Sequence, residues 1–178
     1  ETSSLDPRTT ELVGIAFAWK PGHAVYVPFP PDPKASLNLL ERFRALLEDG
    51  SIEKIGHNLK YDLSVLRWHG IRVEGPFFDT MLAAPLAEPA LRRSLDELAK
   101  SLLAYEPKPI SELIGEKSEE QLTLLQVPVE QVAEYASEDA DVTWQIAGMV
   151  TEELERDNLW DLYWELERPL IPILAEIC

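Results

Sequence analysis

The stretch GHNLKYDLSVLRWHGI, residues 56–71, has the pattern expected where a buried strand leads into a helix. A short apolar run at residues 52–56 comes before it, and apolar side chains then recur every three or four positions until Gly70. Asp62 falls near the start of this predicted helix. The stretch therefore predicts a strand–helix unit that places a carboxylate close to the end of a strand.

Patterns on both sides of this stretch predict further strands and helices. Residues 12–19 and 23–29 flank a Lys-Pro-Gly turn, which predicts a β-hairpin. Ser94 followed by Glu97 predicts a helix that begins with a capping box. The other predicted elements are a strand at 72–78 and helices at 36–49, 59–69, 79–84, 110–114, 129–156 and from about 159, the last broken by Pro169 and Pro172. This order predicts an α/β domain with a mixed sheet.

The composition limits the class of protein. With 178 residues the chain is most simply one domain, residues 1–178. Its formal net charge of -16 argues against a general nucleic-acid binder, because phosphate contacts need clustered Lys and Arg. A nuclease of this charge needs divalent cations, local basic residues or a basic neighbouring domain.

The apolar runs and the cysteine content bear on the cellular compartment of the protein. No apolar run approaches the roughly 20 residues of a membrane helix, so no membrane span is predicted. The only cysteine, Cys178, rules out an internal disulfide and suits a reducing compartment. The sequence therefore predicts a cytoplasmic protein.

Acidic residues in separate segments suggest a metal site. Tyr135 and Asp139 lie four residues apart on one face of a predicted helix. Carboxylates at a strand end, a helix start and a second helix face can converge and bind two divalent ions about 4 Å apart. An all-carboxylate set favours Mg²⁺ or Mn²⁺ over zinc. A nearby tyrosine can orient the attacking water, although with a pKa of about 10 it is a poor base.

Each of these residues also has an ordinary structural explanation. Asp62 can act as a partner of the helix dipole, and Tyr135 can bond Asp139 on a surface helix. The run at 138–141 can be a solvated acidic face, and Glu1 can belong to a frayed chain end. Spacing alone favours these explanations over a metal site.

Six longer segments, considered in their order along the chain, shift the preference from these structural explanations towards a metal site. Together they closely resemble the 3′–5′ exonuclease (proofreading) domain of bacterial family A DNA polymerases. The segments are ETSSLDPRTTELVGIAFA (1–18), GHNLKYDLSVLRWHGI (56–71), FFDTMLAAPL (77–86), SLDELAKSLL (94–103), QLTLLQ (121–126) and YASEDADVTWQ (135–145). One motif alone is weak evidence, whereas this many in register is strong.

The resemblance implies a fold, an activity and a partner. The implied fold is ribonuclease H-like, of the DEDDy exonuclease type: a mixed sheet flanked by helices, with its first strand truncated in this chain. The implied activity is two-metal hydrolysis, with Mg²⁺ or Mn²⁺, of the 3′-terminal nucleotides of single-stranded DNA ends. The implied partner is a polymerase domain of the same polypeptide, reached through residues 159–178.

The resemblance also implies roles for individual residues. Glu1, Asp62 and Asp139 match its metal ligands, and Tyr135 matches its water-orienting tyrosine, so these four are the predicted catalytic residues. The predicted substrate-binding residues are Leu5, which packs against the terminal base, Asn58 and Tyr61 beside the terminal phosphate, and Arg92 near the strand path.

Two departures from the family pattern bear on activity. The family's first Asp, shared by both metals, lies two residues before Glu1 and is absent from this sequence. Ser111 stands where many relatives have an aromatic that packs on the 3′ end. Two other functions remain open. The missing Asp leaves open a catalytically silent exonuclease-like platform, and the Tyr-x-x-x-Asp geometry is shared with RNA exonucleases of the ribonuclease D type.

Overall fold

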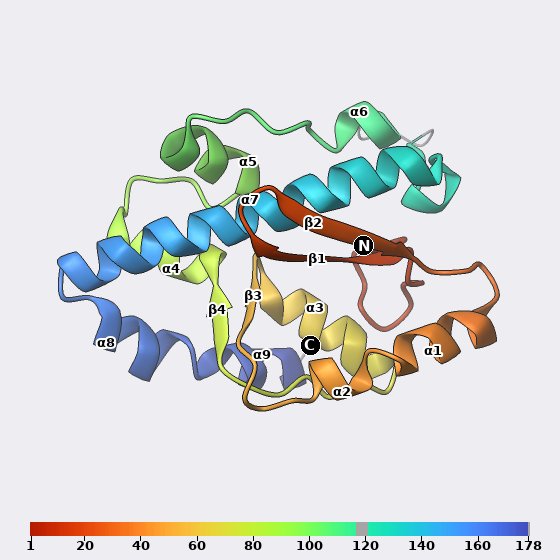
Figure 1. The fold of residues 1–178 in the computed structure, drawn as a ribbon, viewed down its shortest axis with the longest axis horizontal. Helices are drawn as coiled ribbons and strands as arrows, with labels where there is room; N and C mark the ends of the chain where they lie inside the picture. The colour runs from red at the N-terminus through yellow and green to blue at the C-terminus, as the bar shows by residue number, and fades with distance from the viewer. Residues whose placement is uncertain (117–120, 178) are drawn as a thin grey trace.

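A computed structural model describes residues 1–116 and 121–177 (Figure 1). Its first unit is the predicted hairpin, formed by β1 (Gly14–Lys20) and β2 (His23–Pro28). The two strands are antiparallel, with Ala16 opposite Tyr26, and Gly22 turns the chain between them at a φ of 72°. A glycine suits this position because side chains disfavour positive φ. The prediction of a hairpin is confirmed.

The second unit is a parallel strand pair, β3 (Lys54–Gly56) and β4 (Phe77–Asp79), in which Ile55 lies opposite Phe78. Helix α3 (Leu59–Trp68) makes the crossover between the strands. The predicted strand at 72–78 was too long, because Gly75 adopts a φ of 121° and Pro76 has no N–H to donate to a ladder.

The predicted mixed α/β arrangement is confirmed, as small sheets flanked by helices. Within the described residues the antiparallel pair and the parallel pair are two separate sheets, rather than one continuous mixed sheet. An isolated bridge between Thr2 and Leu12 adds a short antiparallel contact beside the hairpin.

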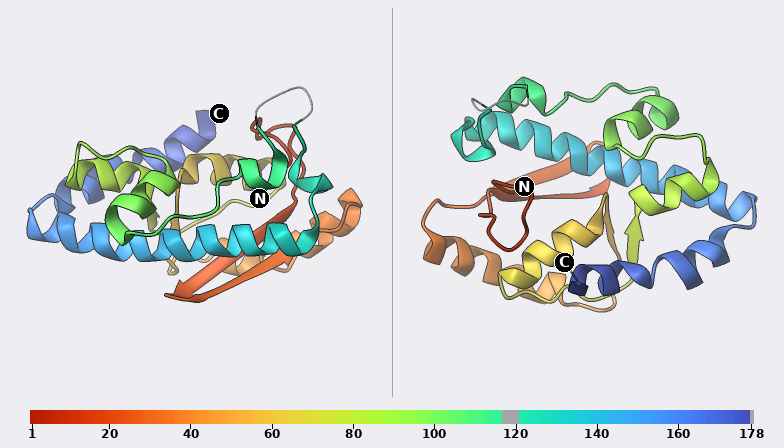
Figure 2. Two further views of the ribbon diagram at one scale, coloured as in Figure 1. Left: turned by 90° about the horizontal axis from the view of Figure 1, so that it is seen from above. Right: turned by 180° about the vertical axis from the view of Figure 1, so that it is seen from behind.

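Helix α7 (Val129–Arg156) connects the two units and corresponds to the long helix predicted at 129–156. It packs across the hairpin and also against α4 (Thr80–Ala87) (Figure 2, left). Its apolar stripe, represented by the fully buried Ile146 and Val150, forms the main core together with Phe78 and Tyr163. Because these side chains are buried in the core, they determine which face of α7 points inward.

The remaining helical segments cover the edges of this core. They are α1 (Pro33–Glu41), α2 (Arg44–Leu47), α5 (Leu95–Leu98), α6 (Ser111–Ile114), α8 (Trp160–Leu162) and α9 (Leu170–Ile177), with π-helical turns at Ala99–Leu103 and Tyr163–Glu167 and a 3-10 turn at Leu124–Gln126. Helix α9 returns to pack along α3 (Figure 2, right). Pro169 lies at the break before α9, as predicted. The predicted break at Pro172 is wrong, because Pro172 lies in the first turn of α9, where a missing N–H costs no hydrogen bond within the helix.

Two helix predictions were wrong in detail. The helix predicted at 36–49 is interrupted at Arg42 and Phe43, whose N–H groups bond the carbonyls three residues earlier, while the Phe43 ring packs on Phe17 with centroids 5.4 Å apart. Ser94 does precede α5, but within the described residues its side chain makes no cap hydrogen bond, so the capping box with Glu97 is absent.

Two predictions concern residues at the margin of the description. Residues 117–120 lie between the predicted helices at 110–114 and 129–156, and Cys178 carries the prediction of a reducing compartment; residues 117–120 and Cys178 lie outside the described residues. Among the residues that are described, no helix is long and apolar enough to cross a membrane.

Candidate active site

A cavity of about 1120 Å³ lies between the hairpin, β3, α3 and α7. Its walls include apolar side chains of β1 and of α2, and also polar residues from segments far apart in the sequence. The four predicted catalytic residues all line it: Glu1, Asp62, Tyr135 and Asp139. The structure therefore brings together around one cavity the residues that the sequence singled out.

Glu1 is placed by backbone hydrogen bonds to the start of β1. Its amino group donates to the carbonyl of Gly14 at 2.7 Å, and its own carbonyl accepts from the N–H of Val13 at 3.0 Å. Gly14 also leaves room for the Tyr26 side chain, because a Cβ at that position would lie 2.1 Å from the hydroxyl oxygen of Tyr26. Glu1 is thus an ordered part of the cavity wall, and the explanation of a frayed end does not describe it.

Asp62 is placed by the way in which α3 begins. Asn58, at the N-cap, adopts a left-handed conformation with a φ of 64°. The buried carboxylate of Asp79 accepts hydrogen bonds from the N–H groups of Asn58 at 3.0 Å and Leu59 at 2.9 Å. It also accepts from the N–H of Met81 at 2.9 Å, so it caps α4 as well. One carboxylate therefore fixes the starts of two helices.

The sequence indicated only part of this role. The pattern at 79–80 predicted Asp79 as the start of a helix, and the structure confirms it as the N-cap of α4. Its hydrogen bonds to the start of α3 join residues about twenty positions apart, and no local pattern predicts such a contact. Burial raises the pKa of Asp79, and the backbone N–H donors oppose that shift.

The surroundings of Asp62 disfavour its charge. The side chain is accessible to water inside the cavity, yet protein atoms enclose it closely enough that desolvation raises its pKa. The carboxylates of Glu1 and Asp79 raise it further.

Asp139 and Tyr135 lie one turn apart on the cavity face of α7. Burial, together with the charge of Glu1, raises the pKa of Asp139 to about 7, while a hydrogen bond with Tyr135 opposes the shift. Burial and the nearby charges of Asp139 and Glu1 raise the pKa of the Tyr135 hydroxyl above its ordinary value. Tyr135 therefore remains protonated at neutral pH and serves as a hydrogen-bond donor.

The cavity also contains an acidic residue that sequence reasoning missed. Asp96, on α5, lines the same cavity, and its charge contributes to the raised pKa values of Asp139 and Tyr135. The sequence signal at this position was the helix pattern alone. Asp96 joins the site because α5 itself packs against α7.

The predicted substrate-binding residues lie outside the cavity lining. Leu5 is 92% exposed on the loop after Glu1. The Tyr61 hydroxyl bonds that same loop, donating to the carbonyl of Ser4 at 2.5 Å. Asn58 stands at the start of α3, and Arg92 is exposed just before α5. Ser111, the departure from the family pattern, begins α6.

Within residues 1–116 and 121–177, no group of three or more His, Cys, Asp or Glu side chains is close enough to hold a metal ion. The electrostatics of the cavity nevertheless suit a divalent cation. Glu1 raises the pKa values of both Asp62 and Asp139, so the carboxylates repel one another in the absence of a compensating charge. Their oxygen donors are those that Mg²⁺ and Mn²⁺ prefer.

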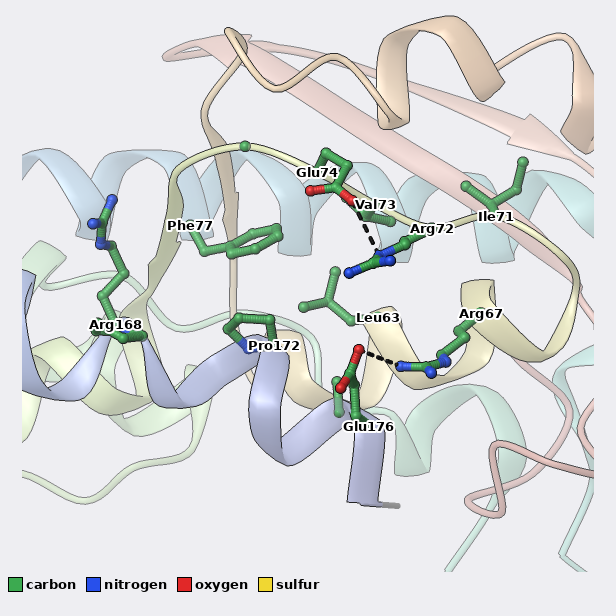
Figure 3. Close-up of a pocket in the computed structure, with 13 residues that line it drawn as sticks. Leu63, Arg67, Ile71, Arg72, Val73, Glu74, Phe77, Arg168, Pro172 and Glu176 are labelled. Atoms are coloured by element: carbon green, nitrogen blue, oxygen red, sulfur yellow. Dashed lines mark ion pairs between the residues drawn. The ribbon is translucent and has the colours of Figure 1, made fainter.

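A second, smaller cavity of about 350 Å³ lies between α3, residues 71–77 and α9 (Figure 3). Its charged residues largely satisfy one another: Arg67 pairs with Glu176 at 2.8 Å and Arg72 with Glu74 at 3.1 Å. The floor is apolar, with Leu63, Phe77 and Pro172. The four predicted catalytic residues line the larger cavity instead, which is therefore the candidate active site.

Comparison with solved structures defines the class of the domain as a ribonuclease H-like exonuclease fold. The structure of Brucella melitensis NrnC with bound Mg²⁺ matches with a TM-score of 0.77 and 26% identity, over 99% of this chain and 81% of that one. The family described as 3′–5′ exonuclease, in the form found in family A DNA polymerases, matches residues 1–155. The chain belongs to this family.

Curated relatives agree with the family. DNA polymerase I of Pseudomonas aeruginosa is 35% identical over 187 residues, and that of Chloroflexus aurantiacus is 36% identical over 183 residues. Each match covers 99% of this chain, but only 20% and 19% of the relative. The chain thus spans about a fifth of the length of these relatives. Pol1 of M. smegmatis shares the fold, with a TM-score of 0.63 over 87% of this chain and 23% of that one.

Proposed function

We propose that this chain is the proofreading domain of a DNA polymerase I, and that it removes 3′-terminal nucleotides from single-stranded DNA ends. The observation that carries the proposal is that Glu1, Asp62, Tyr135 and Asp139, from three distant segments, line one cavity. Membership of the 3′–5′ exonuclease family supports the same reaction.

In this proposal Glu1, Asp62 and Asp139 hold two divalent ions, Mg²⁺ or Mn²⁺. When bound, such ions supply an activated water and stabilise the leaving 3′ oxygen. The structure of NrnC with Mg²⁺ supports this choice of metal. The residues of the chain supply the rest: their carboxylates neutralise the cations, and the protonated Tyr135 hydroxyl donates a hydrogen bond that orients the attacking water.

The proposed DNA contacts surround the cavity. Leu5 offers an exposed apolar side chain for the terminal base, and Asn58 and Tyr61 lie on or beside the helix that carries Asp62. Arg92 supplies a positive charge for the strand. Stacking and backbone contacts carry little base information, so cleavage should depend only weakly on sequence.

The C-terminal segment supports a partner in the same polypeptide. The curated relatives are about five times longer than this chain. Large apolar side chains along the last two helical segments are 40–76% exposed; these are Leu166, Leu170, Ile173, Leu174 and Ile177. We propose that residues 1–178 form the exonuclease domain, that residues 159–178 lead into a polymerase domain, and that this domain covers the exposed face. Because the relatives are bacterial DNA polymerases, the proposed location is the cytoplasm.

The test restores the residues that precede Glu1 in the native protein. We expect the extended protein to release mononucleotides from single-stranded DNA with Mn²⁺, and EDTA to abolish the release. The same protein with Asp62→Asn or Asp139→Asn is the control and should lose most activity. If the native upstream sequence lacks an Asp two positions before Glu1, or if both lengths are inactive with folding intact, the domain is a silent platform instead.

The likeness to NrnC favours a second candidate, an RNA exonuclease of the ribonuclease D type. That protein has also been solved bound to pGG, again with a TM-score of 0.77. Hydrolysis of matched single-stranded DNA and RNA separates the two candidates. We expect preference for DNA, and a clear preference for RNA would replace the DNA proposal with this one.

A further inference from the structure

The loop between Thr2 and Leu12 presents the most exposed large apolar side chain near the site. A bridge between Thr2 and Leu12 closes the loop at its base, and the N–H of Ser3 donates to the carbonyl of Glu11 at 3.0 Å. Leu5 stands on this loop and is 92% exposed. A side chain so exposed has little packing of its own, so its position depends on how its neighbours are held.

Ser4, the residue before Leu5, is held by a cluster of hydroxyl groups. Its N–H donates to Thr10 Oγ1 at 2.9 Å, and Thr10 Oγ1 donates back to its carbonyl at 3.2 Å. The Tyr61 hydroxyl donates to the same carbonyl at 2.5 Å. Thr10 thus engages both backbone groups of Ser4, whereas Tyr61 engages only its carbonyl.

The donors and acceptors of this cluster can be satisfied together. A carbonyl oxygen has two lone pairs, which accept from Tyr61 and Thr10. The Thr2 hydroxyl lies 3.1 Å from the same carbonyl and 2.7 Å from the Tyr61 oxygen, and because both lone pairs of the carbonyl are taken, it donates to Tyr61. Thr10 itself is only 4% exposed, so its hydroxyl would be costly to bury without these partners.

The cluster connects the loop to the catalytic helix. Tyr61 immediately precedes Asp62 in α3, so the hydrogen bond from Tyr61 to Ser4 joins the loop to the turn that carries this carboxylate. The hydroxyl cluster therefore adds a direct link between the loop and α3 to the backbone hydrogen bonds that hold the loop against residues 11–14.

We infer that Thr10 is a positioning residue for substrate binding: through Ser4 it holds Leu5 out toward the terminal base, in register with Asp62. This inference rests on the proposed exonuclease function. Thr10 does not touch the substrate, and it acts only through the backbone that carries Leu5.

The experiment uses the native polymerase that contains this domain. Thr10→Val keeps the shape of the side chain but removes the hydroxyl, whereas Thr10→Ser keeps the hydroxyl. We expect Thr10→Val to raise KM for single-stranded DNA by about threefold to tenfold, with kcat changed less than about twofold, and Thr10→Ser to restore most of the loss. Thr9→Val is the matched control, because Thr9 is exposed and its hydroxyl makes no hydrogen bond within the described residues.

A double-mutant cycle separates positioning from a general structural effect. Once Leu5→Ala has removed the side chain, Thr10→Val should raise KM no further. Equal effects of Thr10→Val with and without Leu5→Ala would overturn the inference, as would an unchanged KM in Thr10→Val.

Amide hydrogen exchange gives a readout that does not need activity. Thr10→Val should speed exchange in residues 3–6, while exchange in α7 stays unchanged. Unchanged exchange in residues 3–6 would also overturn the inference. If the parent protein has no exonuclease activity but the loop responds in this way, the proposed function fails while the role of Thr10 in the loop stands. If Thr10→Val does not fold, the same measurements on Thr10→Ala, which also removes the hydroxyl, take its place.

Discussion

The segment that carries Glu1 and Leu5 and the helix that carries Tyr135 and Asp139 face the same cavity, but different interactions hold them there. Helix α7 is fixed by buried apolar side chains such as Ile146. The N-terminal segment is fixed mainly by hydrogen bonds to the backbone of Gly14 and to the hydroxyls of Thr10 and Tyr61. Packing tolerates changes at the surface but resists the creation of cavities, whereas a hydrogen-bonded segment depends on individual polar atoms.

The largest expected loss of stability follows from a change in the packed helix α7. Ile146→Ala removes a fully buried side chain from the main core and should lower the free energy of unfolding by about 2–5 kcal/mol. Met149→Ala, on an exposed part of the same helix, is the control and should change stability by about 0.5 kcal/mol or less. Urea denaturation monitored by circular dichroism measures both. Equal losses in the two variants would contradict the packed description of α7.

The second largest loss of stability is expected at Asp79, whose carboxylate holds the starts of α3 and α4. Asp79→Ala leaves the N–H groups of Asn58, Leu59 and Met81 without their acceptor, and should cost about 1–3 kcal/mol of stability. It should also lower nuclease activity by more than the loss of folded protein explains, because α3 would no longer hold Asp62 in place. Asp32→Asn, at the exposed N-cap of α1, is the control and should be nearly neutral.

The stability of the fold is expected to depend on pH through His57. This residue lies between β3 and α3 and contacts Thr80, the first residue of α4. Its Nδ1 lies 2.9 Å from the Thr80 hydroxyl, and within the described residues Nε2 has no hydrogen-bond partner. Burial lowers the pKa of His57 to about 4, against 6.5 for the ordinary side chain. Between these values the unfolded chain binds a proton that the folded chain does not, so this residue should lower stability as the pH falls from about 6.5 to about 4.

Thermal unfolding of the wild type and of His57→Gln, measured between pH 4 and pH 8, tests this expectation. The difference between the two Tm values should shift in favour of His57→Gln as the pH falls, and should be constant above about pH 7. A difference that does not vary with pH would mean that His57 titrates normally.

The smallest expected effect is a gain of stability in the hairpin. The Tyr26 hydroxyl is buried and, within the described residues, has no hydrogen-bond partner. Burial raises the pKa of Tyr26 to about 12, so this oxygen stays protonated. Tyr26→Phe removes an unsatisfied polar atom and should raise stability by about 0.5–1 kcal/mol in urea denaturation. A loss of similar size would indicate that the hydroxyl has a partner.

The sequence predicted the packed half better than the hydrogen-bonded half. Helices α3 and α7 follow from apolar periodicity, and the hairpin follows from its turn, so the positions of Asp62, Tyr135 and Asp139 were largely predictable. The role assigned to Glu1 came from resemblance to a family, because one acidic residue carries no periodic signal. That role remains a prediction, although the place of Glu1 in the cavity is now clear.

What the sequence did not reveal depends on contacts between distant residues. The second role of Asp79, the hydroxyl of Thr10 and the presence of Asp96 in the cavity each involve a side chain that meets another segment. The break after Glu41 has a similar cause, since Phe43 packs against Phe17 on the hairpin. Local propensity contains no information about such partners.

The contact between Tyr163 and Asp79 has a consequence for the modularity of this domain. Tyr163 is fully buried beside Phe78, and its hydroxyl accepts the N–H of Asp79 at 2.8 Å. The match to the family ends at residue 155, so the unit recognised by similarity is shorter than the unit that folds. Excision or transplantation of this nuclease should therefore keep the polypeptide through Tyr163, because a graft cut at the family boundary would leave the centre of the fold open.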